Sequence, residues 1–401
     1  MQKEAGLLTD YRLQSKESPN LLNCYKRYPV NPIRGEGAYL YDDEGRKYLD
    51  FISGIAVTPF GHQHPEIKKA VNEQLDNLWH VSSLFFSSLQ EELASKLISA
   101  TKLDKVFFCN SGTESTEAAI KFARKWGNGR SNIISTLGSF HGRTMGSLSA
   151  SGQYKIWEGF QPLTPGFSYV PYNDINAVEY SITSDTVAVI VEPIQGESGI
   201  NVPSENYLSE LREICNQNDL LLILDEVQTG LGRTGKMFAY QWEDVKPDIV
   251  TIAKGIANGL PLGAVVCSEK VSDAITPGVH GSTFGGNFIA VSAAIKVMEL
   301  LTDELIQHVQ NTGQAIKNSI YSFGFSSIQD IRGKGLMIGI LFDKNVNAKE
   351  IALQFLNHGV IVGTAGDNVL RLLPPFIITD NEIEIFNETF YSTLKESIGN
   401  Y

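Results

Sequence analysis

Two residues with complementary chemistry follow two apolar runs of this 401-residue chain. Asp225 ends the run "LLLILD", and Lys254 comes directly after "DIVTIA". A buried lysine amine can form a Schiff base with an aldehyde. A carboxylate that faces the nitrogen of a pyridine ring keeps that nitrogen protonated, which makes the ring an electron sink. The alternative interpretation is a structural ion pair between the two side chains.

A third feature, the stretch "CNSGTESTEAAIKFARKW", predicts a helix that could bind phosphate at its N-terminus. Ser111 and Glu114 have the spacing of a capping box, Gly112 leaves backbone N–H groups open, and Thr113 adds a hydroxyl. Free N–H groups and the helix dipole attract phosphate there, although an ordinary capped helix would look the same. A lysine, a carboxylate and a phosphate site together meet the requirements of pyridoxal phosphate.

Two other motifs resemble a nucleotide-binding loop and a metal site, but neither is complete. The run from Gly230 to Lys236 matches GxxxxGK, but Met237 stands where a nucleotide-binding loop needs Ser or Thr. A nucleotide hydrolase is therefore only a remote alternative. His62 and His64 have a spacing that can bind metal, but no cysteine or acid nearby completes a ligand set, so we predict no metal.

The elements that must position these residues form an α/β pattern. Short apolar strands alternate with helical patterns from about residue 65 to 300, and the strands are predicted at 105–110, 132–136, 187–193, 220–226, 248–253 and 263–268. Continuous apolar strands indicate a mostly parallel sheet between helices. Ligands bind beyond the carboxyl ends of such strands, so Asn110, Glu192, Asp225 and Lys254 should share one cleft. We expect a large domain at 51–300, a smaller α+β domain at 301–401, and an arm with a hairpin at 1–50 that belongs to the small domain.

Composition narrows the class of protein further. The net charge of −12 argues against nucleic acid or an anionic membrane as a partner. Four cysteines without CxxC spacing fit reduced thiols. The N-terminal stretch has no apolar segment typical of a secretory signal, and no apolar run approaches the roughly 20 residues of a membrane span. We therefore expect a soluble, cytoplasmic enzyme.

Nearly the whole chain resembles the class III aminotransferases of fold type I, which are enzymes that use pyridoxal phosphate. The stretches that carry the resemblance are "LDEVQTGLGRTGKMFAYQ", "DIVTIAKG", "CNSGTES", "GSTFGGN" and "RLLPP". The resemblance implies that Lys254 binds the cofactor aldehyde and moves the substrate proton. It also implies a homodimer with shared sites and the following contacts: Asp225 to the ring nitrogen, Val227 and Phe140 on the ring faces, Gln228 to the phenolic oxygen, Gly112 and Thr113 to the phosphate, and Thr283 to the partner's phosphate.

The resemblance further implies how substrates are held. Arg143 in "FHGR" would grip a substrate carboxylate, with Ser282 as a further contact, and Arg371 in "RLLPP" would clamp the α-carboxylate of glutamate or 2-oxoglutarate. Glu197 would pair with Arg371 while an ω-amine substrate is bound.

Within the family, "ISGIAVTPFGHQHP" and "SFHGRTMGSLSASGQYKIWEGFQPL" are most similar to the enzymes of arginine biosynthesis that use N2-acetylornithine as the amine donor. Ornithine, succinylornithine and 4-aminobutyrate stay open as donors, and an aminomutase is a remote alternative. Tyr25 lies where the ornithine enzymes have a substrate-binding tyrosine. Ala257, Asn258 and Ser198 depart from glycines that are frequent in relatives, which weakens the case for one donor.

Overall fold

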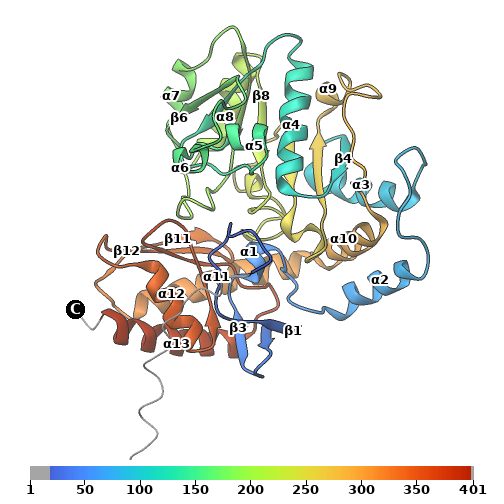
Figure 1. Cartoon of the computed structure of the whole chain (residues 1–401). Helices are drawn as coiled ribbons and strands as arrows, with labels where there is room; N and C mark the ends of the chain where they lie inside the picture. Colours follow the sequence, from blue (N-terminus) through green and yellow to red (C-terminus); the bar gives the residue numbers. More distant parts are fainter. Residues whose placement is uncertain (1–18, 399–401) are drawn as a thin grey trace, which may run out of the picture.

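The computed structural model describes residues 19–398. The first 18 residues of the predicted arm, in which we expect no secretory signal, lie outside the described part. A seven-stranded sheet fills the upper part of Figure 1. Its strands, in spatial order, are β4 (Lys105–Cys109), β10 (Gly263–Cys267), β9 (Ile249–Ile252), β8 (Leu221–Asp225), β7 (Thr186–Val191), β5 (Asn132–Thr136) and β6 (Phe167–Val170). β10 is antiparallel to both of its neighbours, β4 and β9. The remaining neighbouring strands, from β9 to β6 in this order, pair in parallel. The predicted α/β class with a mostly parallel sheet is confirmed.

Helices cover both faces of this sheet, which explains why the central strands β7 and β8 are buried at every residue. In β8, Leu221 and Ile223 pack into one core with helix α4 (Gly112–Trp126). The alternate residues Leu222 and Leu224 pack into the other core with helix α8 (Tyr207–Gln217). Because successive side chains of a strand point to opposite faces, each face needs its own apolar set.

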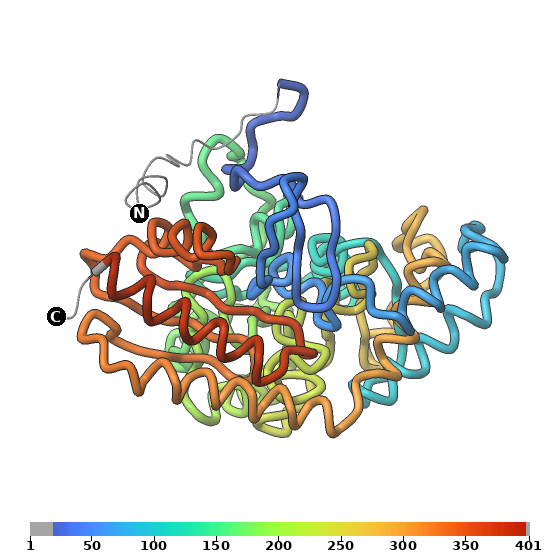
Figure 2. The backbone as a smooth tube through the Cα atoms, turned by 90° about the horizontal axis from the view of Figure 1, so that it is seen from below, coloured from blue at the N-terminus to red at the C-terminus, as the bar shows by residue number. Residues whose placement is uncertain are grey.

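The C-terminal part forms a second body below the sheet in Figure 1. It contains α11 (Asp303–Ser322), α12 (Ala348–Asn357) and α13 (Asp380–Ile398) around a sheet of β11 (Ile328–Lys334), β12 (Met337–Phe342), β15 (Val369–Leu372) and β14 (Gly363–Thr364). The N-terminal strands β1 (Pro32–Glu36), β2 (Tyr39–Asp42) and β3 (Lys47–Asp50) form a third sheet with β13 (Val360–Ile361). The N-terminal strands therefore lie beside the C-terminal part, as Figure 2 also shows.

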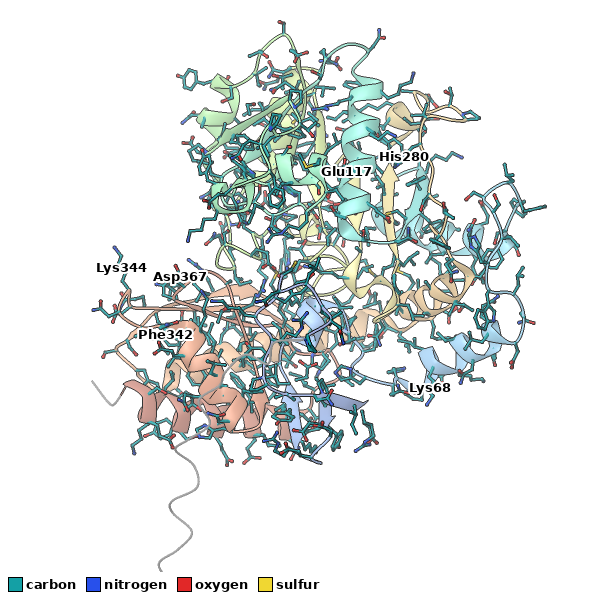
Figure 3. All side chains as sticks on the ribbon, in the orientation of Figure 1. Lys68, Glu117, His280, Phe342, Lys344 and Asp367 are labelled. Atoms are coloured by element: carbon teal, nitrogen blue, oxygen red, sulfur yellow. The ribbon has the colours of Figure 1, made fainter. Side chains whose placement is uncertain are left out.

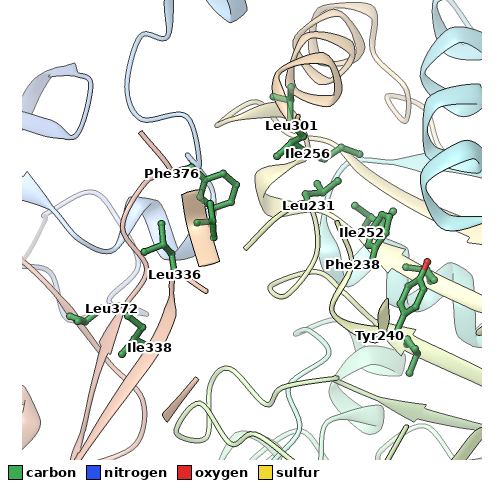
Figure 4. Close-up of a cluster of buried hydrophobic side chains, with 14 of the residues drawn as sticks. Leu231, Phe238, Tyr240, Ile252, Ile256, Leu301, Leu336, Ile338, Leu372 and Phe376 are labelled. Carbon is green, nitrogen blue, oxygen red and sulfur yellow. The ribbon is translucent and has the colours of Figure 1, made fainter. Parts of the chain in front are cut away.

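An apolar core joins the two bodies (Figure 4). Leu231 and Phe238 come from the segment after β8, and Leu336 and Phe376 come from the C-terminal part. Arg233 is buried beside this core and donates from Nη1 to the carbonyls of Leu336 (3.0 Å) and Pro374 (2.6 Å). Burial lowers the pKa of this arginine to about 9. The GxxxxGK-like run is thus a structural connection between the two bodies.

The remaining helices complete the covering layers. They are α1 (Ser53–Ala56), α2 (Pro65–Leu75), α3 (Ser88–Thr101), α5 (Met145–Ala150), α6 (Tyr154–Trp157), α7 (Ile175–Tyr180), α9 (Glu269–Ser272) and α10 (Phe288–Leu300), with short 3-10 turns η1 (Ala239–Trp242) and η2 (Lys254–Ala257). Within residues 19–398, no helix is long and apolar enough to cross a membrane.

Candidate active site

A cavity of about 410 Å³ lies at the carboxyl ends of the central strands. Residues at or just after the ends of β4, β7, β8 and β9 line it, and the structure thereby brings together Asn110, Glu192, Asp225 and Lys254, as the strand pattern predicts. Parallel strands deliver their ends to one edge of the sheet, so residues far apart in sequence meet there.

Lys254 begins η2, one residue beyond the end of β9, and has a left-handed backbone, with φ +47°. Within the described part of the chain, its amine has no hydrogen bond or ion pair closer than 4 Å. Burial lowers the pKa of the Lys254 ammonium; Arg371 acts in the same direction, while Glu197 and Asp225 oppose it. The lowered pKa favours the neutral, nucleophilic form of the amine, and Lys254 is one of the residues that line the cavity.

Asp225 does not pair with Lys254, so the ion-pair interpretation is wrong for this structure. The Asp225 Oδ2 atom lies 2.6 Å from Nδ1 of buried His141, and Oδ1 accepts from the Val227 N–H and the Thr251 hydroxyl, both at 3.0 Å. These contacts fix the carboxylate at the cavity wall. Its neighbour Glu226 points elsewhere and accepts from the Tyr240 N–H at the start of η1.

Glu192, which the strand pattern predicts in the shared cleft, is a second buried acid of the cavity. It accepts backbone N–H groups from Phe140 (3.1 Å) and Gly196 (3.4 Å). Burial, together with the nearby charge of Asp225, raises its pKa well above the usual value. This shift favours the neutral form of Glu192, because a carboxylate is poorly stabilised in a buried site next to a second carboxylate.

The N-terminus of α4 forms the other side of the cavity. Ser111 caps the helix by accepting from the Glu114 N–H (3.3 Å), as predicted. The reciprocal half of the box is shifted by one residue, because the Glu114 carboxylate binds the amide groups of Asn110 rather than the Ser111 N–H. A Cβ on Gly112 would lie 2.8 Å from Cγ1 of Val227, so glycine keeps this wall open. Thr113 lines the cavity beside it.

Phe140 and Arg143 line the cavity on the segment between β5 and α5. The guanidinium carbon of Arg143 lies 5.5 Å from the Phe140 ring centre, and its side chain is exposed at the mouth. Val227 and Gln228 line the cavity directly after Asp225, and the Gln228 Oε1 atom is buried without a hydrogen-bond partner among residues 19–398. Tyr25 is 73% exposed and is not a lining residue.

Glu197 and Arg371 form an ion pair beside the cavity. Arg371 Nη1 lies 2.6 Å from Glu197 Oε1, and Gln228 Nε2 donates to the same oxygen at 3.2 Å. Burial acts to raise the pKa of Glu197, but Arg371 and Lys254 outweigh it and lower the pKa below its ordinary value. The structure thus brings together two residues that are 174 positions apart in sequence, in the predicted combination.

Ser282 and Thr283 do not line this cavity. They line two adjoining cavities of about 650 and 380 Å³, and the smaller one also contains Glu117 and His280, which are labelled in Figure 3. Thr283 is exposed, whereas the Ser282 hydroxyl accepts from Asn110 Nδ2 at 3.2 Å. Within one chain, therefore, Thr283 lies apart from Lys254.

His62 pairs with Asp50, whose Oδ2 lies 2.9 Å from its Nε2. No group of three or more possible metal ligands occurs in residues 19–398.

Comparisons with known proteins show the family to which the chain belongs. The family model for class-III aminotransferases matches residues 23–394. The chain is 47% identical to the acetylornithine aminotransferase of Aquifex aeolicus, over 91% of this chain and 96% of that protein. It is 44% identical to the Bacillus subtilis enzyme of the same name, over 95% and 98% of the two chains.

Solved structures give the same result. The ornithine aminotransferase of Toxoplasma gondii superposes with a TM-score of 0.91 and is 31% identical, with 94% of this chain and 93% of that chain covered. The N-acetylornithine aminotransferase of Stenotrophomonas maltophilia has a TM-score of 0.82 and 34% identity, with 93% and 97% covered. With its fold and its strand-end cavity, this chain belongs to the class-III aminotransferase family.

Proposed function

We propose that this aminotransferase uses pyridoxal phosphate to transfer the distal amine of N2-acetylornithine to 2-oxoglutarate. The products would be N-acetylglutamate 5-semialdehyde and glutamate, a step in arginine biosynthesis. The relatives at 42–47% identity that carry the name acetylornithine aminotransferase support this donor.

The cavity residues fit pyridoxal phosphate. Gly112 leaves open the space in front of Val227 that a Cβ would fill, and Gln228 Oε1 is a buried acceptor without a partner in the described chain. Lys254 would hold the aldehyde carbon, Asp225 the ring nitrogen, and the N-terminus of α4 the phosphate. When bound, the cofactor supplies an electron sink that stabilises negative charge on the substrate carbon.

The protein's own residues would perform the remaining tasks. Lys254, with its lowered pKa, is suited to take a proton from the substrate carbon and return it at the cofactor. His141 and Thr251 hold Asp225 in one orientation through hydrogen bonds of 2.6 and 3.0 Å. Phe140 and Val227 would confine the ring between their side chains.

The charges around Arg143 carry the choice of donor. N2-acetylornithine has a neutral acetamide next to its α-carboxylate, whereas ornithine has an ammonium there. Of the acids that line the cavity, Asp225 binds His141 and Glu192 is held by backbone N–H groups. Neither is free to compensate an ammonium beside the Arg143 guanidinium, so a neutral amide is favoured there.

We further propose a homodimer in which Ser282 and Thr283 complete the partner's site. Thr283 is exposed and lies outside the Lys254 cavity. Large apolar side chains are exposed in the same region, with Phe85 at 66% and Phe284 at 61%. Such residues are typical of a surface that a second subunit covers. The unpaired cysteines of the chain support a cytoplasmic location.

A panel of amine donors with 2-oxoglutarate tests the proposal. We expect kcat/KM for N2-acetylornithine to exceed that for ornithine by about tenfold or more, equivalent to roughly 1.4 kcal/mol. Succinylornithine and 4-aminobutyrate should be poorer donors. A preference for ornithine would overturn the donor assignment, and turnover of an amine without any keto acid would indicate an aminomutase.

A further inference from the structure

The loop that carries Glu197, Gln195–Asn201, has a strained backbone. Ile200 is fully buried and has φ +54°, a left-handed conformation that is costly for a β-branched residue. Gly199 before it has φ +130°. Such strain costs on the order of 1–3 kcal/mol and persists only where the surroundings fix the backbone firmly. The contacts of the loop show which groups do so.

One set of contacts fixes the loop to the large sheet. Gln195 and Asn201 exchange backbone hydrogen bonds of 3.1 and 3.0 Å, which close the loop. The Ser198 hydroxyl donates to Gln195 Oε1 and accepts from Asn201 Nδ2, both at 3.0 Å. Gln195 Nε2 in turn donates to the carbonyl of Leu137, just after β5, at 2.9 Å. Ser198 is therefore one of the side chains that join the two ends of the loop, together with Asn201, whose Nδ2 also donates directly to Gln195 Oε1 at 3.3 Å.

A second set of contacts fixes the loop from the C-terminal part. Arg332 of β11 donates from Nε to the carbonyl of Gly199 at 2.8 Å. Ile200 packs against Gly339 of β12 so closely that a Cβ on that glycine would lie 2.8 Å from the Ile200 Cβ. The loop is thus held from two independent directions, by elements that belong to different bodies of the fold.

Among residues 19–398, by contrast, the Glu197 side chain is held only on its cavity side. It contacts Arg371 and Gln228 and keeps 29% of its surface exposed. We infer that Ser198 and Arg332 are positioning residues that keep the loop backbone fixed, so that the Glu197–Arg371 pair opens by rotation of the Glu197 side chain alone. The inference rests on the predicted role of Glu197, which leaves Arg371 when glutamate binds.

The consequence is a selective effect on one half-reaction. When the amine donor is bound, Glu197 must sit within hydrogen-bonding distance of Arg371 to compensate its charge. When glutamate is bound, its own carboxylate compensates Arg371, and the position of Glu197 matters little. Loosening the loop should therefore slow the donor half-reaction and spare the glutamate half-reaction.

Single-turnover absorbance of the cofactor-loaded enzyme measures the two half-reactions separately. For Ser198→Ala and for Arg332→Met, we expect the ratio of the donor rate to the glutamate rate to fall roughly fivefold, the equivalent of one lost hydrogen bond. Ser204→Ala is the matched control: it removes a serine hydroxyl that also bonds an amide oxygen, that of Asn173 at 2.7 Å, but on an exposed loop. Its ratio should equal that of the parent enzyme.

Glu197→Ala, measured in parallel, distinguishes the predicted role of Glu197 from the positioning role of Ser198 and Arg332. If it leaves the ratio unchanged, the predicted role of Glu197 fails. If it changes the ratio while Ser198→Ala and Arg332→Met do not, or if these two slow both half-reactions equally, the positioning role is overturned. Thermal melting checks that each variant is folded. Because the two substitutions act on opposite sides of the loop, each one tests the positioning role of its own residue.

Discussion

Replacing Glu197 by alanine should change the balance between the two half-reactions rather than abolish activity. In the parent enzyme, Glu197 compensates Arg371, which is only 4% exposed at its side chain, across a distance of 2.6 Å. An ω-amine donor brings no carboxylate to Arg371. In the alanine variant, that guanidinium would therefore have no charged partner when the bound donor displaces water from the site. Glutamate brings its own carboxylate and no longer has to displace Glu197.

The size of the effect follows from the burial of the pair. Removing one partner of a fully buried pair costs about 3–5 kcal/mol. Here Glu197 is 29% exposed, and Arg371 Nη1 keeps a contact of 3.3 Å with the Gly196 carbonyl, so we discount the cost to about 2 kcal/mol. That energy corresponds to about a thirtyfold fall in the ratio of donor to glutamate rates.

Single-turnover absorbance of each half-reaction is the assay, with Glu197→Gln as a variant that keeps the size but loses the charge, and Glu205→Ala as a control at an exposed acid. The glutamine variant should lie between the parent and the alanine variant. Equal losses in both half-reactions would refute the reasoning. So would an unchanged ratio.

The same pair predicts a pH dependence. Although burial acts to raise the pKa of Glu197, Arg371 and Lys254 lower it overall, below the ordinary value of 4.5. A depressed carboxyl pKa means that the pair is intact above the ordinary value and is lost only as pH falls through the lower one. Titration of Glu197 should therefore leave the parent enzyme's ratio constant between about pH 6 and 8. A change that Glu197→Gln abolishes would contradict this assignment.

Three further predictions concern the cavity. Because burial lowers the pKa of Lys254, cofactor uptake by the apoprotein, followed by absorbance, should reach half its maximal rate below the value of about 10.4 for an exposed lysine, and a midpoint at or above it would contradict the burial argument. Lys254→Ala should abolish multiple turnover, but mixing it with an inactive Thr283→Ala chain should restore activity in the hybrid dimer; a fully active monomer would exclude shared sites. Arg143→Ala should lower kcat/KM for N2-acetylornithine by at least about tenfold while the absorbance of the bound cofactor stays unchanged, and an altered spectrum would place Arg143 at the cofactor instead.

The sequence predicted the middle of the central sheet well because β7, β8, β9 and β10 are buried on both faces and therefore appear as nearly continuous apolar runs. It missed β6, "FSYV", where only Val170 is fully buried, and β1, which is mostly exposed. Such strands are held by hydrogen bonds to neighbouring strands, and their sequences lack the continuous apolar run by which the other strands were predicted. The convergence of strand ends was predictable for the same reason that the sheet was, since parallel strands end at one edge.

Contacts between distant segments were not predictable from spacing. The hydrogen bond between His141 and Asp225 joins residues 84 positions apart, and the burial of Glu192 depends on backbone N–H groups that only the folded loops present. Arg233 shows the limit most clearly. Its run could be excluded as a nucleotide loop, but its true partners are two carbonyls more than 100 positions away.

Two of the departures from frequent glycines, Asn258 and Ser198, have a common physical explanation. Asn258 has φ +46°, the region that glycine adopts without strain and asparagine tolerates better than most residues. Its side chain accepts from the Phe60 N–H (2.9 Å) and donates to the Gly61 carbonyl (3.0 Å), which fastens η2 and Lys254 to the segment after α1. Ser198 fastens the Glu197 loop in the same way, through side-chain hydrogen bonds. In both places a side chain that glycine lacks makes hydrogen bonds that hold the backbone behind the site. These two positions therefore support the catalytic residues. We assign the choice of donor to the charges around Arg143.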